Sequence, residues 1–411
     1  MNPNATPPTA TKEDLTFADI VWVQFKKNRV SYGALWMLGL LFLLAIVAPL
    51  LASERPFLWN DGTGLTMPWF SSLFDRNYFE NPVDIFFNLL LIFGVPLSGF
   101  ALWRIRRIQA LGLDKRPRRT KMIKEIRILI VVFFATFAGI LAMPHSEPYT
   151  QYNDILEQRT EAGETTQAVF PPIRYMFRKT GFKSLAKPSW KHPLGVDEST
   201  RDVSVRILYG TRISLTIGVI AVGIYVTIGI ILGSLAGFYR GKTDIVIQRM
   251  IEIVMSIPTL IIILVLVAFL EKPSIFHIML VIGLVRWTGV ARLVRGEFYR
   301  LRNLEFVTSA IALGFPTHTV IFKHILPNAM GPVLVAATFG VASAILLEST
   351  LSFLGMGDVS APSWGQTLAE GYSSGAWHLI LAPGFAIFMT VSLLNLVGEG
   401  VRDALDPKMR K

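Results

Sequence analysis

Side chains that could perform catalysis are sparse in this sequence of 411 residues. It contains no cysteine, which excludes thiol nucleophiles, disulfides, cysteine zinc sites and iron–sulfur clusters. Its six histidines are scattered, and none belongs to the H-E-x-x-H pattern in which two histidines hold zinc and a glutamate acts as base. The sequence therefore predicts a chain that is not an enzyme and that binds no metal or cofactor itself.

One short string approaches a nucleotide-binding motif. Gly241-Lys242-Thr243 matches the end of the phosphate-binding loop G-x-x-x-x-G-K-[ST], but Ala236 stands where the first glycine belongs. The string also follows an apolar run rather than a soluble β-strand, so we expect no ATP binding. A spacing of four residues between glycines instead gives one helix a smooth face that another helix can approach closely. The glycines predicted to pack in this way are Gly229, Gly233, Gly237 and Gly241.

The segment best suited to a specific contact is 304–327. Its apolar residues follow a helical period, Gly314 is placed to end that helix, and a second short helix through 322–325 should end at Pro327. Two short amphipathic helices at a fixed angle would form a rigid knob, whose apolar face suits a partner's groove. The alternative is a solvated loop. The residues expected to make the contact are Phe306, Val307, Thr308, Ala310, Gly314, Phe315, Pro316, Leu326 and Pro327.

Two carboxylates stand in or beside apolar runs. An ionisable side chain is costly there, so a functional role is the first hypothesis for Glu252 and Glu348, namely the lining of a cavity. Near the end of a helix, either side chain would simply reach water. The glycine-rich segment 354–377 also leaves two alternatives, an outer gate that dips back or a plain surface loop.

The elements that must position these residues are apolar. Hydrophobic residues make up 52% of the chain and charged residues only 17%, and the charged residues are bunched. A helix needs ~20 apolar residues to cross ~30 Å of hydrocarbon, so the long apolar windows predict an all-α polytopic membrane protein with about eight spans. The windows lie at 35–52, 83–103, 128–143, 213–237, 251–270, 275–291, 331–353 and 378–398.

The positive charge predicts the orientation. With both termini in the cytoplasm, 27 of the 40 lysines and arginines lie in inner segments, as cytoplasmic loops require. Ten of the remaining residues lie in the long segment 144–212, where this rule has little force. The most basic run, 104–127, then becomes an inner loop beside anionic lipid, so the net charge of +11 does not predict nucleic-acid binding.

The windows divide the chain into segments with different expected places. We expect a cytoplasmic segment at 1–34, a first span at 35–52, and an outer segment with two extra spans around the basic loop 104–127 at 53–143. An extracytoplasmic lobe at 144–208, a five-span core at 209–403 and a cytoplasmic tail at 404–411 complete the chain.

The segment 308–327 resembles the EAA loop of permease subunits of ATP-binding-cassette (ABC) importers. That loop reads Glu-Ala-Ala, three residues, glycine and then Leu-Pro twelve residues after the glycine. This chain has Thr308-Ser309-Ala310, Gly314 and Leu326-Pro327. The glycine and Leu-Pro spacing matches, while the glutamate and first alanine are replaced, so the polar contact of that glutamate with the ATPase is not implied here.

Further strings, in family order over about 192–408, are similar to the C-type permease of oligopeptide and dipeptide importers. They include His192-Pro-Leu-Gly195, Arg201-Asp202-Val203, Ser256-Ile-Pro258, Ser363-Trp364-Gly365 and Asp406-Pro407. Ala52-Ser-Glu54-Arg55-Pro56 and Pro172-Ile173-Arg174 also look like the Yej-type branch, which is associated with peptide and microcin C uptake.

The resemblance implies a type I ABC-importer transmembrane domain in the bacterial inner membrane, with a five-span core and cytoplasmic coupling helices. It implies a homologous B-type permease, two ABC ATPase subunits that hold ATP and Mg, an extracytoplasmic peptide-binding protein and membrane lipid as partners. Two alternatives remain on the residues alone. One is a secondary transporter or channel driven by an ion gradient without an ATPase, and the other is a membrane scaffold built around the basic loop.

Overall fold

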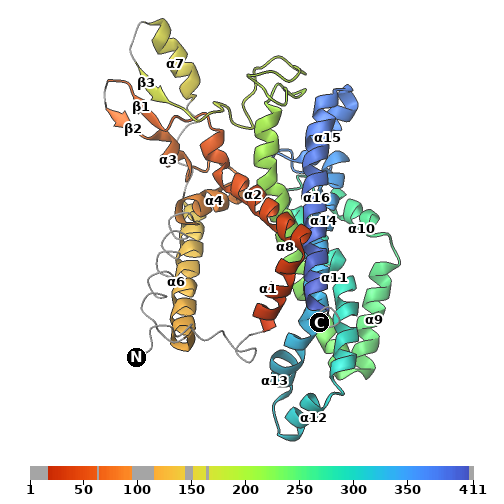
Figure 1. Cartoon of the computed structure of the whole chain (residues 1–411). Helices are drawn as coiled ribbons and strands as arrows, with labels where there is room; N and C mark the ends of the chain where they lie inside the picture. Colours follow the sequence, from red (N-terminus) through yellow and green to blue (C-terminus); the bar gives the residue numbers. More distant parts are fainter. Residues whose placement is uncertain (1–16, 63, 95–114, 144–150, 163–165, 407–411) are drawn as a thin grey trace, which may run out of the picture. The chain divides into compact units, whose positions relative to one another are not determined.

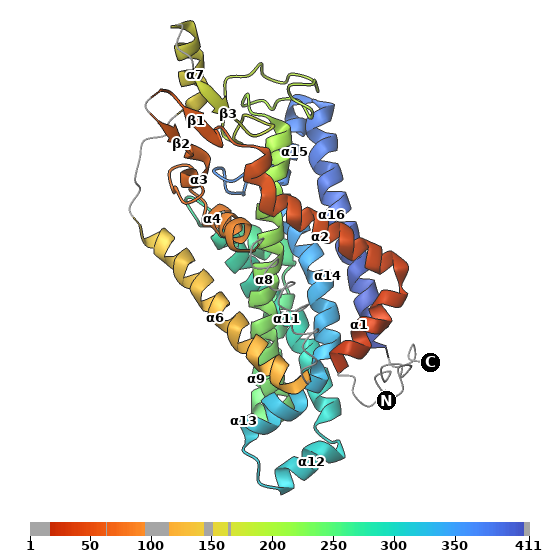
Figure 2. The ribbon, with the colours of Figure 1, turned by 60° about the vertical axis from the view of Figure 1, so that its left-hand side comes forward.

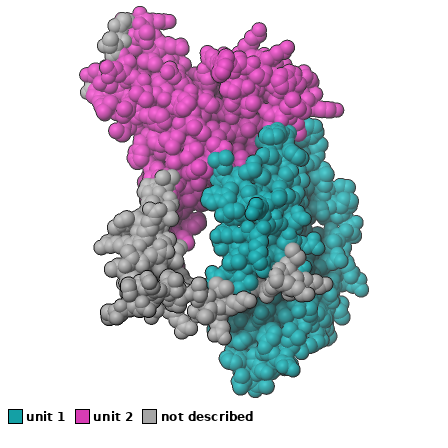
Figure 3. Space-filling view, in the orientation of Figure 1, with its two compact units in different colours: residues 1–40, 217–358, 383–411 teal, residues 41–216, 359–382 magenta. Residues whose placement is uncertain are grey.

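The computed structural model describes residues 17–62, 64–94, 115–143, 151–162 and 166–406. It divides into two compact units, shown in Figure 3. Unit 1 consists of the chain up to Leu40, Ile217–Asp358 and the chain from Pro383, and unit 2 consists of Leu41–Thr216 and Val359–Ala382.

Unit 1 is helical throughout its described part (Figure 1). Three long helices contribute to both units, namely α2 (Arg29–Leu51), α8 (Val203–Tyr239) and α16 (Trp377–Leu405). The helices that lie wholly in unit 1 are α1 (Phe17–Lys27), α9 (Gly241–Met255), α10 (Thr259–Ala268), α11 (Ile275–Leu301), α12 (Glu305–Ala312), α13 (Thr317–Thr319), the π-helix η3 (Val320–Ile325) and α14 (Leu326–Phe353).

Glycines let α8 and α11 touch along their backbones. A Cβ atom at Gly233 would stand 2.5 Å from the Ala291 carbonyl oxygen, and one at Gly237 would stand 2.5 Å from Phe298 Cβ. A Cβ atom at Gly229 would meet Val290 at 2.6 Å. These three glycines therefore form the smooth face of α8 that the four-residue spacing predicts.

Gly241 does not share this face, which corrects the prediction for the fourth glycine. A Cβ atom there would meet nothing within 4 Å, and the residue has a φ of +56° after Arg240 at +58°. Gly241 begins α9, so it serves the sharp turn between two helices, where a positive φ favours glycine.

The apolar window 251–270 is broken rather than straight, which is a second correction. Helices α9 and α10 meet at an angle of 79° across the residues between Met255 and Thr259. Pro258 has no N–H to continue the hydrogen-bond ladder of α9, and its ring disfavours helical backbone at Ile257. Pro258 instead caps the start of α10.

Unit 2 combines short helices with a small antiparallel sheet of order β2-β1-β3. In the sheet, Trp59 pairs with Thr66 on one side and with Ala168 on the other. Its strands are β1 (Leu58–Asn60), β2 (Leu65–Thr66) and β3 (Gln167–Val169), and its helices are α3 (Pro68–Ser72), α4 (Pro82–Leu89), η2 (Leu90–Gly94), α6 (Lys115–Ala142), α7 (Tyr152–Glu161) and α15 (Trp364–Ser374).

An aromatic core joins distant stretches of unit 2. Tyr209 of α8 lies 5.2 Å from Phe177 and 6.4 Å from Phe79 between ring centroids, and its hydroxyl donates to the Ala52 carbonyl at 2.9 Å. Tyr152 stacks edge-on against Trp59 at 5.1 Å. Tyr152, Phe177 and Tyr209 are therefore packed within unit 2.

The number of spans stays a prediction. Among the described residues, five helices are long and apolar enough to cross a membrane, and the bent pair of α9 and α10 makes a sixth. The apolar helices Pro82–Gly94 and Arg127–Ala142 are shorter, and 95–103 of the second window lies outside the described residues. In the basic segment, 115–127 belongs to α6, which has Pro117 in its first turn, where a helix tolerates proline.

Candidate functional site

Helix α12 forms a knob that projects from unit 1 between α11 and α13 (Figures 1 and 2). From here on, the name knob is kept for 304–316, the first part of the predicted segment 304–327. Its helix ends in a Schellman motif, in which Gly314 N–H donates to Ile311 and Phe315 N–H donates to Ala310, at 2.9 and 3.2 Å. Gly314 has a φ of +77° and open space around its α-carbon. Glycine is therefore needed here for backbone conformation, as the sequence predicts.

The knob has a buried anchor and an exposed apolar surface. Val307 and Ala310 are 0% and 4% exposed, and α12 packs through them toward η3. Thr308 and Pro316 are exposed, and Pro316 caps the start of α13. Large apolar side chains face outward at Leu304, Phe306, Ile311, Leu313 and Phe315. A group of exposed apolar side chains on a protruding helix marks an interaction surface.

The second helix of the knob region does not end at Pro327, contrary to the prediction. The chain passes from α13 through η3 directly into α14, where Pro327 lies in the first turn. A π-type bond from Leu326 N–H to the Ile321 carbonyl accommodates the proline. The Asn328 side chain donates to the His324 carbonyl at 2.7 Å and so satisfies an acceptor at this junction. The knob is thus rigidly continuous with α14.

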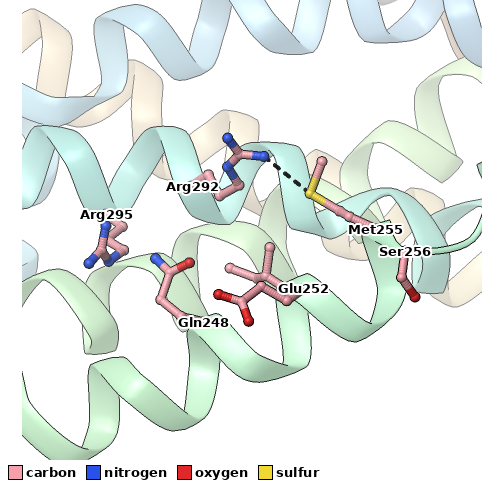
Figure 4. A pocket seen from close by; sticks show the side chains of 7 residues that line it. Gln248, Glu252, Met255, Ser256, Arg292 and Arg295 are labelled. Atoms are coloured by element: carbon pink, nitrogen blue, oxygen red, sulfur yellow. Dashed lines mark hydrogen bonds between the residues drawn. The ribbon is translucent and has the colours of Figure 1, made fainter.

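A polar pocket of ≈ 560 Å³ opens between α9 and α11 of unit 1 (Figure 4). Arg292 of α11 contributes a guanidinium whose Nη1 lies 3.3 Å from Met255 Sδ. Glu252 of α9 contributes a carboxylate, paired with Arg249 at 2.5 Å. The residues around the opening are Gln248, Ile251, Glu252, Met255, Ser256, Arg292 and Arg295.

An ion pair clamps one end of this pocket. Arg295 holds Asp244 through two parallel bonds, with Nε to Oδ1 at 2.5 Å and Nη2 to Oδ2 at 2.7 Å. The Tyr299 hydroxyl also donates to Asp244 Oδ2 at 2.5 Å. The fork geometry of a guanidinium on a carboxylate fixes orientation as well as distance, so α9 is tied firmly to α11 at this point.

The two predicted cavity carboxylates have different surroundings. Glu252 lines the pocket and is exposed. Glu348 of α14 is only 2% exposed, and its carboxylate accepts from the Ser352 hydroxyl at 2.8 Å and from Ser349 at 3.5 Å. Glu348 is therefore packed within its unit, which corrects its assignment to an open cavity.

A buried charge network organises unit 2. Asp197 is fully buried and accepts from Arg201 Nε at 2.8 Å, with Arg206 Nε at 3.4 Å. Arg201 reaches Glu370 of α15 at 2.9 Å. Burial is the main cause that raises the pKa of Glu370 above its ordinary value. These charges pair with one another and hold the segment 197–206 to α15, although Arg206 Nη2 and Glu370 Oε2 are buried without a hydrogen-bond partner among the described residues.

A second buried arginine joins three helices of unit 2. Arg212 of α8 is 0% exposed and donates to Asp84 Oδ1 and Asn88 Oδ1 of α4, both at 3.0 Å. Its Nε donates to the Ala45 carbonyl of α2 at 2.7 Å. These three contacts are thus structural, because each satisfies a group that burial would otherwise leave unpaired.

The segment 354–377 is not a plain loop. It contains helix α15, capped by the Ser363 side chain, which accepts from Gly365 N–H, and ended by Gly375 at a φ of +67°. Within it, 371–375 matches the G-x-S-x-G pattern of a nucleophile elbow. Ser373 nevertheless lies inside a helix and donates to the Glu370 carbonyl at 3.1 Å, so the strained strand-to-helix turn of an elbow is missing at this place.

Sequence reasoning placed Glu252 but missed the rest of the pocket. Asp244, Arg292 and Arg295 come from two helices, and the clamp joins residues 51 positions apart. The available signal was the pair Arg292 and Arg295, one turn apart just after an apolar window, since ionisable residues in a membrane span mark functional positions.

Comparison with known proteins identifies related chains. Residues 229–411 match the protein family described as "Binding-protein-dependent transport system inner membrane component". Residues 16–68 match the family described as "N-terminal TM domain of oligopeptide transport permease C". The Bacillus subtilis (strain 168) oligopeptide transport system permease protein OppC is 41% identical over 252 residues, which cover 59% of this chain and 82% of that protein.

Two relatives match nearly the whole chain. The inner membrane ABC transporter permease protein YejE of Escherichia coli (strain K12) is 30% identical over 398 residues, covering 94% of this chain and 96% of that protein. The peptidoglycan transport system permease protein YejE of Agrobacterium fabrum (strain C58 / ATCC 33970) is 29% identical over 392 residues, covering 94% and 92%. The similarity to these two proteins therefore extends well beyond the C-terminal half.

Proposed function

The chain belongs to the family of binding-protein-dependent transport system inner membrane components, and from this premise we propose that it forms half of the translocation pathway of an ABC importer for peptides. The names of its relatives support peptides as the class of substrate. The same relatives favour this function over a transporter driven by an ion gradient alone.

The observation that carries the proposal is the exposed apolar surface of the knob. Leu313 is 77% exposed and Phe315 45% exposed, while Val307 beneath them is fully buried. Exposed apolar residues on a rigidly anchored helix gain free energy only when a partner covers them. The partner is an ABC ATPase subunit, into whose groove α12 docks.

The complete importer contains a homologous B-type permease, two ATPase subunits and an extracytoplasmic peptide-binding protein. ATP and Mg bind to the ATPase subunits, and this chain supplies the helices that move. Both termini lie in the cytoplasm of this inner-membrane protein, an orientation supported by the 27 lysines and arginines in the segments then placed inside.

Coupling acts through helix continuity. Helix α11 leads into the knob. After the knob, α13, η3 and α14 follow one another as a continuous helix. When the ATPases close on ATP, displacement of the knob moves these two helices together. The resulting change opens the pathway alternately to the outer and inner faces.

The test is co-purification of the importer with a charge placed on the knob. Leu313→Asp should abolish retention of the ATPase and ATP-dependent peptide uptake, because the exposed side chain has no structural contact to lose. The matched control is Val359→Asp, at a residue that is 84% exposed and far along the chain from the knob. Normal co-elution of the ATPase with the Leu313 variant would refute docking through this surface.

A further inference from the structure

The pocket between α9 and α11 is lined by charges of both signs, Glu252, Arg292 and Arg295, in helices that belong to candidate membrane spans (Figure 4). Arg292 lies on α11 and Glu252 on α9, so the two charges face the opening from different helices. Ionisable groups in such helices almost always face a water-filled space and mark the route of a substrate. The pocket therefore belongs to the translocation pathway rather than to a lipid-facing surface.

Arg292 is held by a weak interaction. The acceptor drawn to its guanidinium is the thioether sulfur of Met255, at 3.3 Å. A thioether is a poor acceptor, whereas a guanidinium carries five donors and matches the two oxygens of a carboxylate. The side chain is exposed, so an incoming carboxylate can replace the sulfur without breaking a strong bond.

Glu252 is also available to a ligand. Its partner Arg249 lies one turn away on α9, and the two side chains are 56% and 72% exposed. An exposed ion pair of this kind contributes little stability, because water screens it and both side chains lose freedom. A ligand cation that enters the pocket therefore competes easily for the Glu252 carboxylate.

The other charges at the pocket are fixed. Arg295 is engaged by Asp244 in two bonds, and Asp244 also accepts from Tyr299. This clamp neutralises Arg295 and sets the spacing between α9 and α11. The charges left for a ligand are thus one cation, at Arg292, and one anion, at Glu252.

We propose that this pocket binds the two ends of a peptide in transit, with Arg292 taking the C-terminal carboxylate and Glu252 taking the N-terminal ammonium group. This rests on the proposed function and names the part of the peptide that the permease reads. A simple anion such as a phosphate would be repelled by Glu252, whereas an unblocked peptide satisfies both charges. A volume of ≈ 560 Å³ falls in the ordinary range for small-ligand sites.

The position of the pocket connects it to the knob. Arg292 precedes the end of α11 at Leu301 by about 13 Å of helix axis, and α12 follows directly. A peptide held by its two ends between α9 and α11 therefore contacts the same helix that leads into the knob. Occupancy of the pocket is thereby placed to influence the knob.

The test changes the side chain and the substrate separately and together, as in a double-mutant cycle. It is measured with the assembled importer in proteoliposomes, in the presence of its binding protein. ATP-dependent uptake of tri-alanine and of its C-terminal amide is measured as kcat/KM for the wild type and for Arg292→Gln. We expect the preference for the free carboxylate to shrink about tenfold or more in the variant, the effect of one lost charged hydrogen bond. Selection by the binding protein cancels, because it is common to both transporters.

The contact of Glu252 with the N-terminal ammonium group is tested separately. Glu252→Gln should reduce the preference for tri-alanine over N-acetyl-tri-alanine, again by about tenfold or more, and should leave the response to amidation unchanged. Arg300→Gln is the control on α11, because Arg300 is 63% exposed and pairs with Glu297 outside the pocket. It should leave both preferences as in the wild type.

Several outcomes would overturn the proposal. Equal effects of amidation on the wild type and on Arg292→Gln would mean that Arg292 does not read the carboxylate. A uniform loss of uptake for all peptides would assign the arginine to a lipid or to structure, as would failure of both pocket variants to assemble. Absence of ATP-dependent uptake of either peptide by the wild type would instead remove the proposed function, and this inference with it.

Discussion

The contact between α8 and α11 can be tested with a single methyl group. A Cβ atom at Gly233 would lie 2.5 Å from the Ala291 carbonyl oxygen, 2.8 Å from Val294 Cβ and 3.1 Å from Ala291 Cα. Two of these atoms are backbone, so the neighbour cannot rotate away as a flexible side chain would. Gly233→Ala must push the helices apart, and overpacking of this kind costs about 1–3 kcal/mol.

The same helix offers a control of opposite sign. Gly223 also lies in α8, but a Cβ atom there would meet nothing within 4 Å. Gly223→Ala should therefore stabilise the protein by about 0.5–1 kcal/mol, because alanine loses less backbone freedom in a helix than glycine does. The two variants differ only in what the added methyl group meets.

The measurement is thermal unfolding of the purified importer in one detergent, followed by fluorescence. Gly233→Ala should unfold several degrees below the wild type and Gly223→Ala at or above it. Uptake should fall for the first variant, because α11 leads into the knob, and should persist for the second. Equal melting temperatures for both alanine variants would refute close packing of α8 on α11.

Three further predictions follow from local geometry. Gly314→Ala should weaken ATPase retention and lower the free energy of unfolding by about 1–2 kcal/mol, since alanine disfavours the φ of +77° at this position. A pull-down of the ATPase measures the change in retention. Burial raises the pKa of Glu370 above 4.5, so its protonated form favours the fold and stability should fall as pH rises through the raised pKa. Glu370→Gln should flatten that pH dependence in thermal melts. Asp244→Asn should lower thermal stability by about 1–3 kcal/mol, because Arg295 loses its charged acceptor, and an unchanged melt would contradict the clamp.

The parts of the fold that the sequence predicts well depend on neighbouring residues. The end of α12 is one of them, because a glycine after an amphipathic run followed by Pro316 specifies a left-handed cap within a few residues. The packing face of α8 is another, because the spacing of its glycines is a property of one helix. Both features use information that lies within one or two turns.

The features that sequence reasoning missed depend on alternatives close in energy or on distant partners. Pro327 reads as a helix end, yet one π-type bond and the side chain of Asn328 let the chain continue into α14. The fork between Arg295 and Asp244 requires two helices to come together, and no local pattern encodes which carboxylate an arginine meets. Glu348 shows the same limit, because its serine partners are visible in the sequence but its burial is not.

Helix α11 connects the knob to the pocket mechanically. Over Ile275–Leu301 it spans about 40 Å, it touches the glycine face of α8 near Ala291, and it is tied to α9 at Arg295. Interlocked helices move as a body, because close packing resists gradual deformation. A displacement at the knob must therefore carry the pocket wall with it. If the pocket binds a peptide as we propose, the bound peptide must bias the position of the knob in return, since coupling between two sites is reciprocal.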